Sequence, residues 1–292
     1  MKEKVYSMFV ILAGMCWGVM SIFVRKLTAI GFDPMQITMV RMWTGVLLIA
    51  VFVFFYNKQC FKIKLKDLPI FAGIGIFSSL TMSYMYFAAM VEIPVSVAAI
   101  LLYTAPIWVL IVSVIFFKEN LTKEKIIALI LAFGGCVCVS GFSGGKMSVI
   151  GIIYAVISGL AYAAYSIAGK VVTKKYSPMT ITLYSFIFAA IGSMFICDFG
   201  GAVRLTVQSF DTRMFMLILG LGAVSMALPF SLYTIGLSGI PAGKAAIMAS
   251  VEPMMATLVG FFVFDESLSI LGIFGITAIL AAIILLNVKK ES

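Results

Sequence analysis

Long apolar runs follow one another along the whole chain, separated by short polar segments. Each run holds about 19–24 residues, the length that a helix needs to cross the hydrocarbon core of a bilayer. The core offers no hydrogen-bonding solvent, and barrel strands are much shorter, so the runs are predicted to be helices. They cover residues 6–24, 35–56, 68–90, 94–117, 124–142, 148–169, 178–197, 214–236, 241–264 and 268–288. The predicted fold is an all-α integral membrane protein with ten transmembrane helices.

The runs form a duplicated unit. The segment 239–266 repeats the segment 92–119 at a constant offset of 147 positions, and the first two runs resemble the sixth and seventh. Each unit therefore holds five runs, and because five is odd, the second unit enters the membrane from the opposite side, as in many secondary transporters. We expect two inverted five-helix repeats, residues 1–145 and residues 146–292.

The basic residues of the loops predict the orientation. With the N-terminus inside, fifteen of the 21 Lys and Arg residues fall on the inner side, five fall on the outer side, and Arg41 lies within a run. Cytoplasmic loops of membrane proteins carry the excess of positive charge. We therefore predict a multi-pass protein of the inner or plasma membrane with both termini cytoplasmic.

Composition supports this class and excludes others. Hydrophobic residues make up 63% of the chain and charged residues only 11%, values that a soluble domain does not reach. The net charge of +9 comes from short loops between apolar runs, so no nucleic-acid binding is predicted. Five cysteines without any histidine make no zinc site, and the glycine-rich stretches lack the spacing of a phosphate-binding loop. No enzymatic activity, metal or cofactor is predicted.

One ionisable residue, Glu252, falls near the middle of the ninth run. With Pro241 as the first helical residue, Glu252 lies about 16 Å into a core about 30 Å thick. A charge at that depth costs roughly 2.5–3.5 kcal/mol and normally faces a protein interior or a water-filled cavity. Glu252 is therefore predicted to accept a proton, to bind a substrate amine or to pair with another buried group. The alternative is a neutral carboxyl group that is hydrogen-bonded between helices.

Other candidates lie on the same run and its counterpart. Lys244 precedes Glu252 by two four-residue steps, and it either contacts substrate or extends to the cytoplasmic face. Ser250 belongs to a stripe of small and polar residues that ends at Pro253, and an equivalent stripe ends at Pro106. These prolines free backbone carbonyls in mid-membrane, which favours a cavity over a simple packing seam. Aromatic residues that could line such a cavity are Trp17, Tyr84, Tyr103, Tyr162, Tyr165 and Tyr233.

Three further charged residues have open roles. Arg41, in the second run, either extends outward or pairs with Asp33. Glu119 and Glu266 end the fourth and ninth runs, where the helix macrodipole disfavours an anion. Their recurrence suggests an interhelical hydrogen bond or the start of the following helix.

Several motifs occur in the order typical of a known family. They are Trp17-Gly18 with Arg25-Lys26, Arg41, Tyr103-Thr104-Ala105-Pro106 with Phe117-Lys118-Glu119-Asn120-Leu121-Thr122, and Glu252-Pro253 with Asp265-Glu266-Ser267-Leu268. In these motifs the chain resembles the EamA family of the drug/metabolite transporter superfamily over nearly its whole length. The resemblance implies a central cavity between helices 1, 3, 4, 6, 8 and 9, with helices 5 and 10 at the periphery. It also implies the transport, often the export, of small metabolites such as amino acids.

We therefore expect a secondary-active exporter that works by alternating access around a midplane cavity. Amino acids or related zwitterions are the favoured substrates, because the charges of Lys244 and Glu252 could each meet an opposite one. Protons are the candidate coupling ion, the lipid bilayer is the surrounding partner, and a monomer is compatible with the sequence. The alternative is a sensor or receptor that binds a small ligand without transporting it, although the chain shows no soluble output domain.

Overall fold

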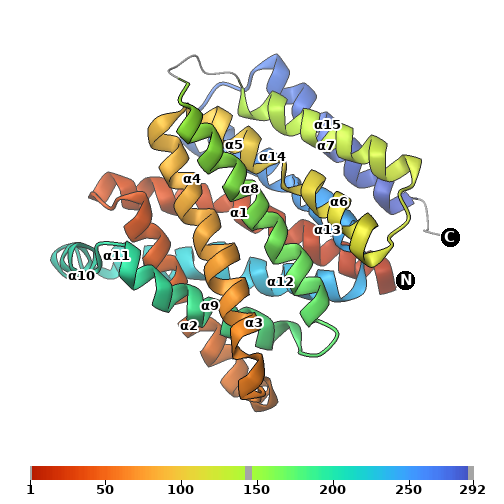
Figure 1. The fold of residues 1–292 in the computed structure, drawn as a ribbon. Coiled ribbons are helices and arrows are strands. Elements are labelled where there is room, and N and C mark those ends of the chain that lie inside the picture. The colour runs from red at the N-terminus through yellow and green to blue at the C-terminus, as the bar shows by residue number, and fades with distance from the viewer. Residues whose placement is uncertain (1, 142–146, 289–292) are drawn as a thin grey trace.

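The computed structural model describes residues 2–141 and 147–288, and these residues form helices joined by short loops (Figure 1). The α-helices are α1 (Lys2–Ile30), α2 (Pro34–Tyr56), α3 (Leu68–Ala72), α4 (Thr81–Glu92), α5 (Val95–Leu102), α6 (Ala105–Phe117), α7 (Lys123–Ser140), α8 (Val149–Val172), α9 (Pro178–Ile196), α10 (Phe199–Gln208), α11 (Thr212–Gly222), α12 (Leu228–Gly239), α13 (Ala242–Ala249), α14 (Val251–Phe264) and α15 (Ile270–Val288). Two 3₁₀ turns, η1 (Lys58–Phe61) and η2 (Leu65–Asp67), and two π-helical segments, η3 (Gly73–Leu80) and η4 (Ala223–Ala227), complete the chain. The predicted junction between residues 145 and 146 lies outside the described residues.

Nine helical segments of the described chain are long and apolar enough to cross a membrane. They correspond to nine of the ten predicted runs. The remaining run, 124–142, is largely covered by α7, whose first turn carries three charged residues, and its last position lies outside the described residues. An all-helical, multi-pass membrane protein is thus confirmed, whereas the count of ten spans stays a prediction.

The backbone repeats its irregularities at the offset seen in the sequence. One span is interrupted at Tyr103, between α5 and α6, and another at Ser250, between α13 and α14. The left-handed residues Lys118 and Asp265, both with φ of 54°, end α6 and α14. The π-helical segments η3 and η4 lie at matching places before α4 and α12. The two halves therefore share their local backbone structure as well as their sequence pattern.

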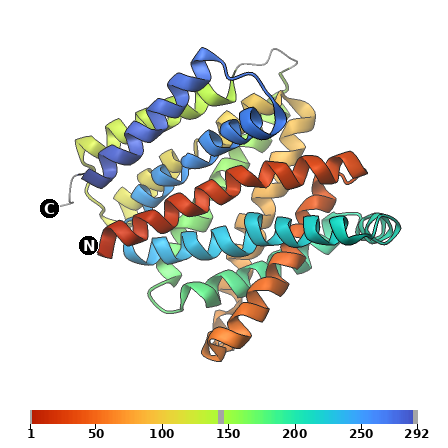
Figure 2. The ribbon, with the colours of Figure 1, turned by 180° about the vertical axis from the view of Figure 1, so that it is seen from behind.

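The start of α1 and the end of α15 lie on the same side of the molecule, here called the N side (Figure 1). The opposite side, here called the far side, holds the end of α1 and the beginnings of α5 and α8. Helices α7 and α15 pack against each other at the periphery, as Figure 2 shows from behind. The other helices surround a centre where the interrupted spans α5–α6 and α13–α14 face each other.

Close backbone contact between α7 and α15 generates a prediction about stability. A Cβ atom added at Gly135 would lie 2.7 Å from Ile279 Cγ1 and 2.8 Å from the Gly275 carbonyl oxygen. Around the adjacent Gly134, none of the described neighbouring residues has an atom within 4 Å of the added Cβ. We expect Gly135→Ala to destabilise the protein by about 1–3 kcal/mol through overpacking. Gly134→Ala should leave the melting temperature in detergent unchanged or raise it slightly, since alanine favours helices. Equal effects of both variants would contradict this packing.

Candidate functional site

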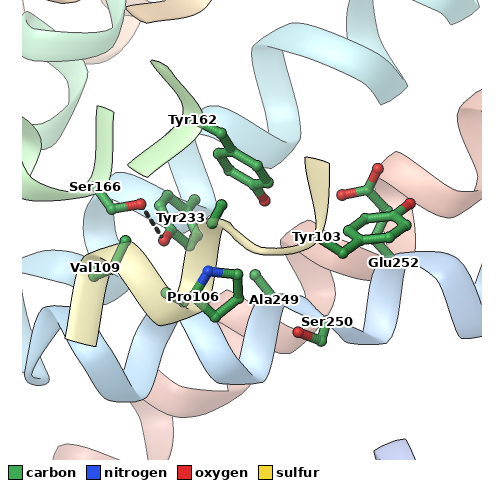
Figure 3. Close-up of a pocket in the computed structure, with 11 residues that line it drawn as sticks. Tyr103, Pro106, Val109, Tyr162, Ser166, Tyr233, Ala249, Ser250 and Glu252 are labelled. Atoms are coloured by element: carbon green, nitrogen blue, oxygen red, sulfur yellow. Dashed lines mark hydrogen bonds between the residues drawn. The ribbon is translucent and has the colours of Figure 1, made fainter. Parts of the chain in front are cut away.

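A small pocket lies where the two interrupted spans meet (Figure 3). Both repeats line it, through Tyr103, Ala105, Pro106, Val109, Tyr162, Ser166, Tyr233, Ala246, Ala249, Ser250 and Glu252. Its volume of about 10 Å³ is roughly the space of a single water molecule. A metabolite therefore requires the pocket to widen.

Prolines explain why the helices are interrupted at the pocket. Pro106 and Pro253 have no backbone N–H, so neither can donate the helical hydrogen bond to the carbonyl four residues earlier, at Leu102 or Ala249. In a bilayer such a break is tolerated only where protein or water surrounds it, as it does here.

Glycines of the opposite repeat cover both interruptions. A Cβ atom added at Gly14 of α1 would lie 3.0 Å from the Ala249 carbonyl oxygen. One added at Gly159 of α8 would lie 3.3 Å from the Leu102 carbonyl oxygen. Because a side chain would prevent these approaches, glycine at both positions lets α1 and α8 seal the breaks of the other half. Small residues of α1 and α8 thus allow close helix packing at the site itself.

Glu252 is the charged residue of the pocket. It is the second residue of α14, and its negative charge is favoured near the positive end of that helix dipole. The Tyr103 hydroxyl lies beside the Glu252 carboxylate, and Tyr162 faces the same space (Figure 3). Glu252 lies deep in the protein, is only partly buried, and lines the pocket.

Arg41 supplies a positive charge from α2. The side chain is 9% exposed, and its guanidinium donates to Ser83 Oγ at 2.8 Å and to Met20 Sδ at 3.2 Å. Its Nε atom has no hydrogen-bond partner in the described part of the chain, and its charge interacts with the Glu252 carboxylate. The sequence left two roles open for Arg41, extension outward and pairing with Asp33. Neither applies, because Arg41 is buried and Asp33 instead caps the N-terminus of α2.

Aromatic residues form the wall behind the pocket. Trp17 is 6% exposed and packs against Phe230, Tyr233 and Tyr162, with ring centroids 5.0, 5.5 and 6.3 Å away. The Tyr233 hydroxyl is hydrogen-bonded to Ser166 Oγ at 2.7 Å. Tyr162 and Tyr233 thus line the pocket, whereas Trp17 supports them from the second layer.

Two other predicted tyrosines lie elsewhere. Tyr84 is 40% exposed and shares a face of α4 with Val91, so it does not belong to the pocket. Tyr165 is fully buried and hydrogen-bonded to Thr234. Tyr86, which the sequence did not single out, lies close enough for the charge of Glu252 to act on it. Tyr86 follows Ser83, the partner of Arg41, by three residues, but only the structure shows that partnership, so the sequence held no signal for Tyr86.

Lys244 lies away from Glu252, towards the N side. It is buried in α13, and its Nζ donates to Glu3 Oε1 at 2.7 Å. The interruption at Ser250 separates the two residues onto different helices. The structure therefore does not bring Lys244 and Glu252 together, and we replace Lys244 by Arg41 as the cation of the proposed site.

The two recurring glutamates have different partners. Glu119 Oε1 accepts a hydrogen bond of 2.9 Å from the backbone N–H of Ala242, the first residue of α13. Glu266 Oε1 instead accepts from Arg25 at 2.6 Å, and both of these side chains are about half exposed. Glu119 thus forms the interhelical hydrogen bond suggested by the recurrence, while Glu266 forms a surface ion pair.

Comparison with known proteins adds a family. The model of the EamA-like transporter family matches residues 5–141 and 149–288, once for each repeat. An uncharacterized transporter of Archaeoglobus fulgidus is 30% identical over 278 residues, 94% of each chain. The threonine/homoserine exporter RhtA of Escherichia coli strain K12 is 25% identical, over 88% of this chain and 83% of its own. A solved crystal structure, 14% identical, superposes with a TM-score of 0.78 over 97% of this chain and 96% of its own, which shows a shared fold.

The ion pair of Lys244 with Glu3 generates a prediction, because its members are unequally buried. The Lys244 side chain is 4% exposed and that of Glu3 is 38% exposed. Glu3→Gln leaves a buried cation without its partner and should destabilise the protein by about 1–3 kcal/mol. Lys244→Met leaves only a carboxylate that water can reach, so we expect a smaller loss. Melting temperatures in detergent test the order, and a larger loss for Lys244→Met would contradict it.

Proposed function

Since the chain belongs to the EamA-like transporter family, we propose that it is a secondary-active exporter of small zwitterionic metabolites, with amino acids as the favoured class. The pocket between the interrupted spans is the proposed binding site. Transporters built from inverted repeats bind their substrates near the bilayer midplane, at discontinuous helices, as in this arrangement. The threonine/homoserine exporter among the relatives supports the substrate class.

The observation that carries the substrate class is a pair of opposite charges, Glu252 in the pocket lining and Arg41 near enough for its charge to act on Glu252. Within the described chain, the buried Nε–H of Arg41 has no hydrogen-bond partner. A zwitterion supplies the complement of both charges, its carboxylate for the guanidinium and its ammonium for Glu252. In the empty protein the two side chains balance each other, which lowers the cost of holding them inside the membrane.

Proton coupling follows from the same carboxylate. A proton and a substrate ammonium both neutralise Glu252, so each excludes the other. Glu252 binds a proton from one side of the membrane and substrate from the other side in turn. The protein thereby exchanges protons for substrate across the membrane. The loop charges predict that the N side faces the cytoplasm. In that orientation, exchange of external protons for internal substrate exports the substrate.

Transport by purified protein in proteoliposomes tests the role of Glu252. We expect a pH gradient to drive movement of labelled threonine, homoserine or other amino acids in the unmodified protein. Glu252→Gln should reduce this at least tenfold, because a hydrogen bond to a charged group contributes about 1.5–3 kcal/mol, or roughly 10- to 100-fold. Glu92→Gln, a change of an exposed carboxylate at the end of α4, is the matched control. Gradient-driven transport that survives Glu252→Gln rejects this role, and ligand binding without any transport favours the sensor.

Modified substrates test the role of Arg41. Arg41→Lys retains the charge but loses the paired geometry of the guanidinium, and Arg41→Gln loses both. We expect KM for an amino acid to rise in the order of unmodified protein, Arg41→Lys and Arg41→Gln, by about tenfold or more at the last step. The methyl ester of the same amino acid lacks the carboxylate, so its transport should respond little to either change. Equal losses for acid and ester would mean that Arg41 is only structural.

A further inference from the structure

The two ends of the molecule differ at positions that the repeat makes equivalent. On the N side, Glu119 caps the first backbone N–H of α13, at Ala242, with a distance of 2.9 Å. Lys170 of α8 donates to the carbonyl oxygens of Leu237 and Ile240 at 2.8 and 2.7 Å. The anion lies at a helix N-terminus and the cation at a helix C-terminus, the placement that the dipoles favour. Together they fix the turn between α12 and α13 to α8 and to the segment that follows α6.

Each of these groups has a counterpart on the far side. The equivalent pairs, separated by 147, 147 and 145 positions, are Glu119 with Glu266, Ala242 with Val95, and Lys170 with Arg25. The far-side groups do not repeat the N-side contacts. Within the described ranges Glu266 is bonded to Arg25 rather than to Val95, which is 53% exposed.

Helix packing differs in the same sense. On the N side α13 packs against α6 and α8. On the far side, α5 is the helix equivalent to α13 and α14 is the helix equivalent to α6. These two helices have at most sparse contact with each other. The Glu266 side chain borders a cavity of about 240 Å³, so it has room to change partner. Its ion pair with Arg25 is exposed, and exposed pairs contribute little to stability, so little is lost when it breaks.

We propose that Glu266 and Arg25 are the two halves of a far-side gate, and that this structure is the state in which the gate is open. In the alternate state Glu266 caps the N–H of Val95, the first residue of α5. Arg25 then binds the carbonyl oxygens at the end of α4, at Met90 and Ile93, while Glu119 and Lys170 release their helix ends. The gate rests on the alternating access of the proposed function.

Distances between paired spin labels test the gate without substrate. Labels at Val91 and Phe262 report the far side, and labels at the equivalent Ser238 and Ile115 report the N side; all four positions are exposed. In a cysteine-free protein in lipid nanodiscs, we expect a short and a long distance at each pair. Loss of one helix cap changes such an equilibrium by roughly tenfold. Glu266→Gln should lower the far-side-closed fraction by about that factor, and Glu119→Gln should raise it equally.

The opposite signs distinguish a gate from a general loss of stability. Asp265→Asn is the matched control, because asparagine tolerates the left-handed backbone and the equivalent residue in the other repeat is Lys118. We expect Arg25→Gln to lower the far-side-closed fraction, as Glu266→Gln does, and Lys170→Gln to raise it, as Glu119→Gln does. These variants provide a second test if one of the first pair fails to fold. The gate proposal would be overturned if Glu266→Gln and Glu119→Gln shifted the far-side-closed fraction in the same direction. It would also be overturned if Glu119→Gln caused no shift, or if Asp265→Asn caused a shift as large as that of Glu266→Gln. A transport failure with intact opposite shifts would reject the proposed function and not the gate.

Discussion

A helix broken in the middle of a bilayer is the constraint on which the rest of this structure depends. Lipid satisfies no backbone hydrogen bond, so the interruptions at Tyr103 and Ser250 are stable only inside protein. Each is covered by a helix from the other repeat, through Gly14 of α1 and Gly159 of α8. Neither half can therefore form its own break without the other half. The pocket, the polar atoms around it and the cross-packing of the repeats follow from this one requirement.

The charges at the centre obey the same rule. Arg41 and Glu252 lie at depths where an isolated charge is costly, and each has polar partners and the opposite charge of the other. The pair is incomplete, because Arg41 Nε has no partner within the described chain and Glu252 is partly accessible. A fully satisfied pair would be a structural element only. The unused hydrogen-bonding capacity of Arg41 is the basis for the proposal that this pair binds a ligand.

Much of the fold follows from the sequence, because lipid imposes long apolar helices and duplication leaves matching prolines. The place of Glu252 near the middle of its apolar span also follows from counting residues. The partners do not. Lys244 pairs with Glu3, which is 241 positions away, and no local pattern links them. The sequence also did not separate Tyr84 from Tyr86, because the lipid-facing side of a membrane helix is as apolar as its interior side.

The scaffold repeats itself, but the charges of the site do not, since Ala105 stands at the position equivalent to Glu252. In the proposed alternating access, the two similar halves exchange conformations, so that two states of the whole molecule are nearly equal in energy. Groups at the ends, such as Glu119 and Glu266, then differ in their contacts although the sequence treats them alike. Groups near the centre move least in such an exchange. In this proposal one charged pair at the centre faces either side in turn, and a second copy would only add a second charge to bury.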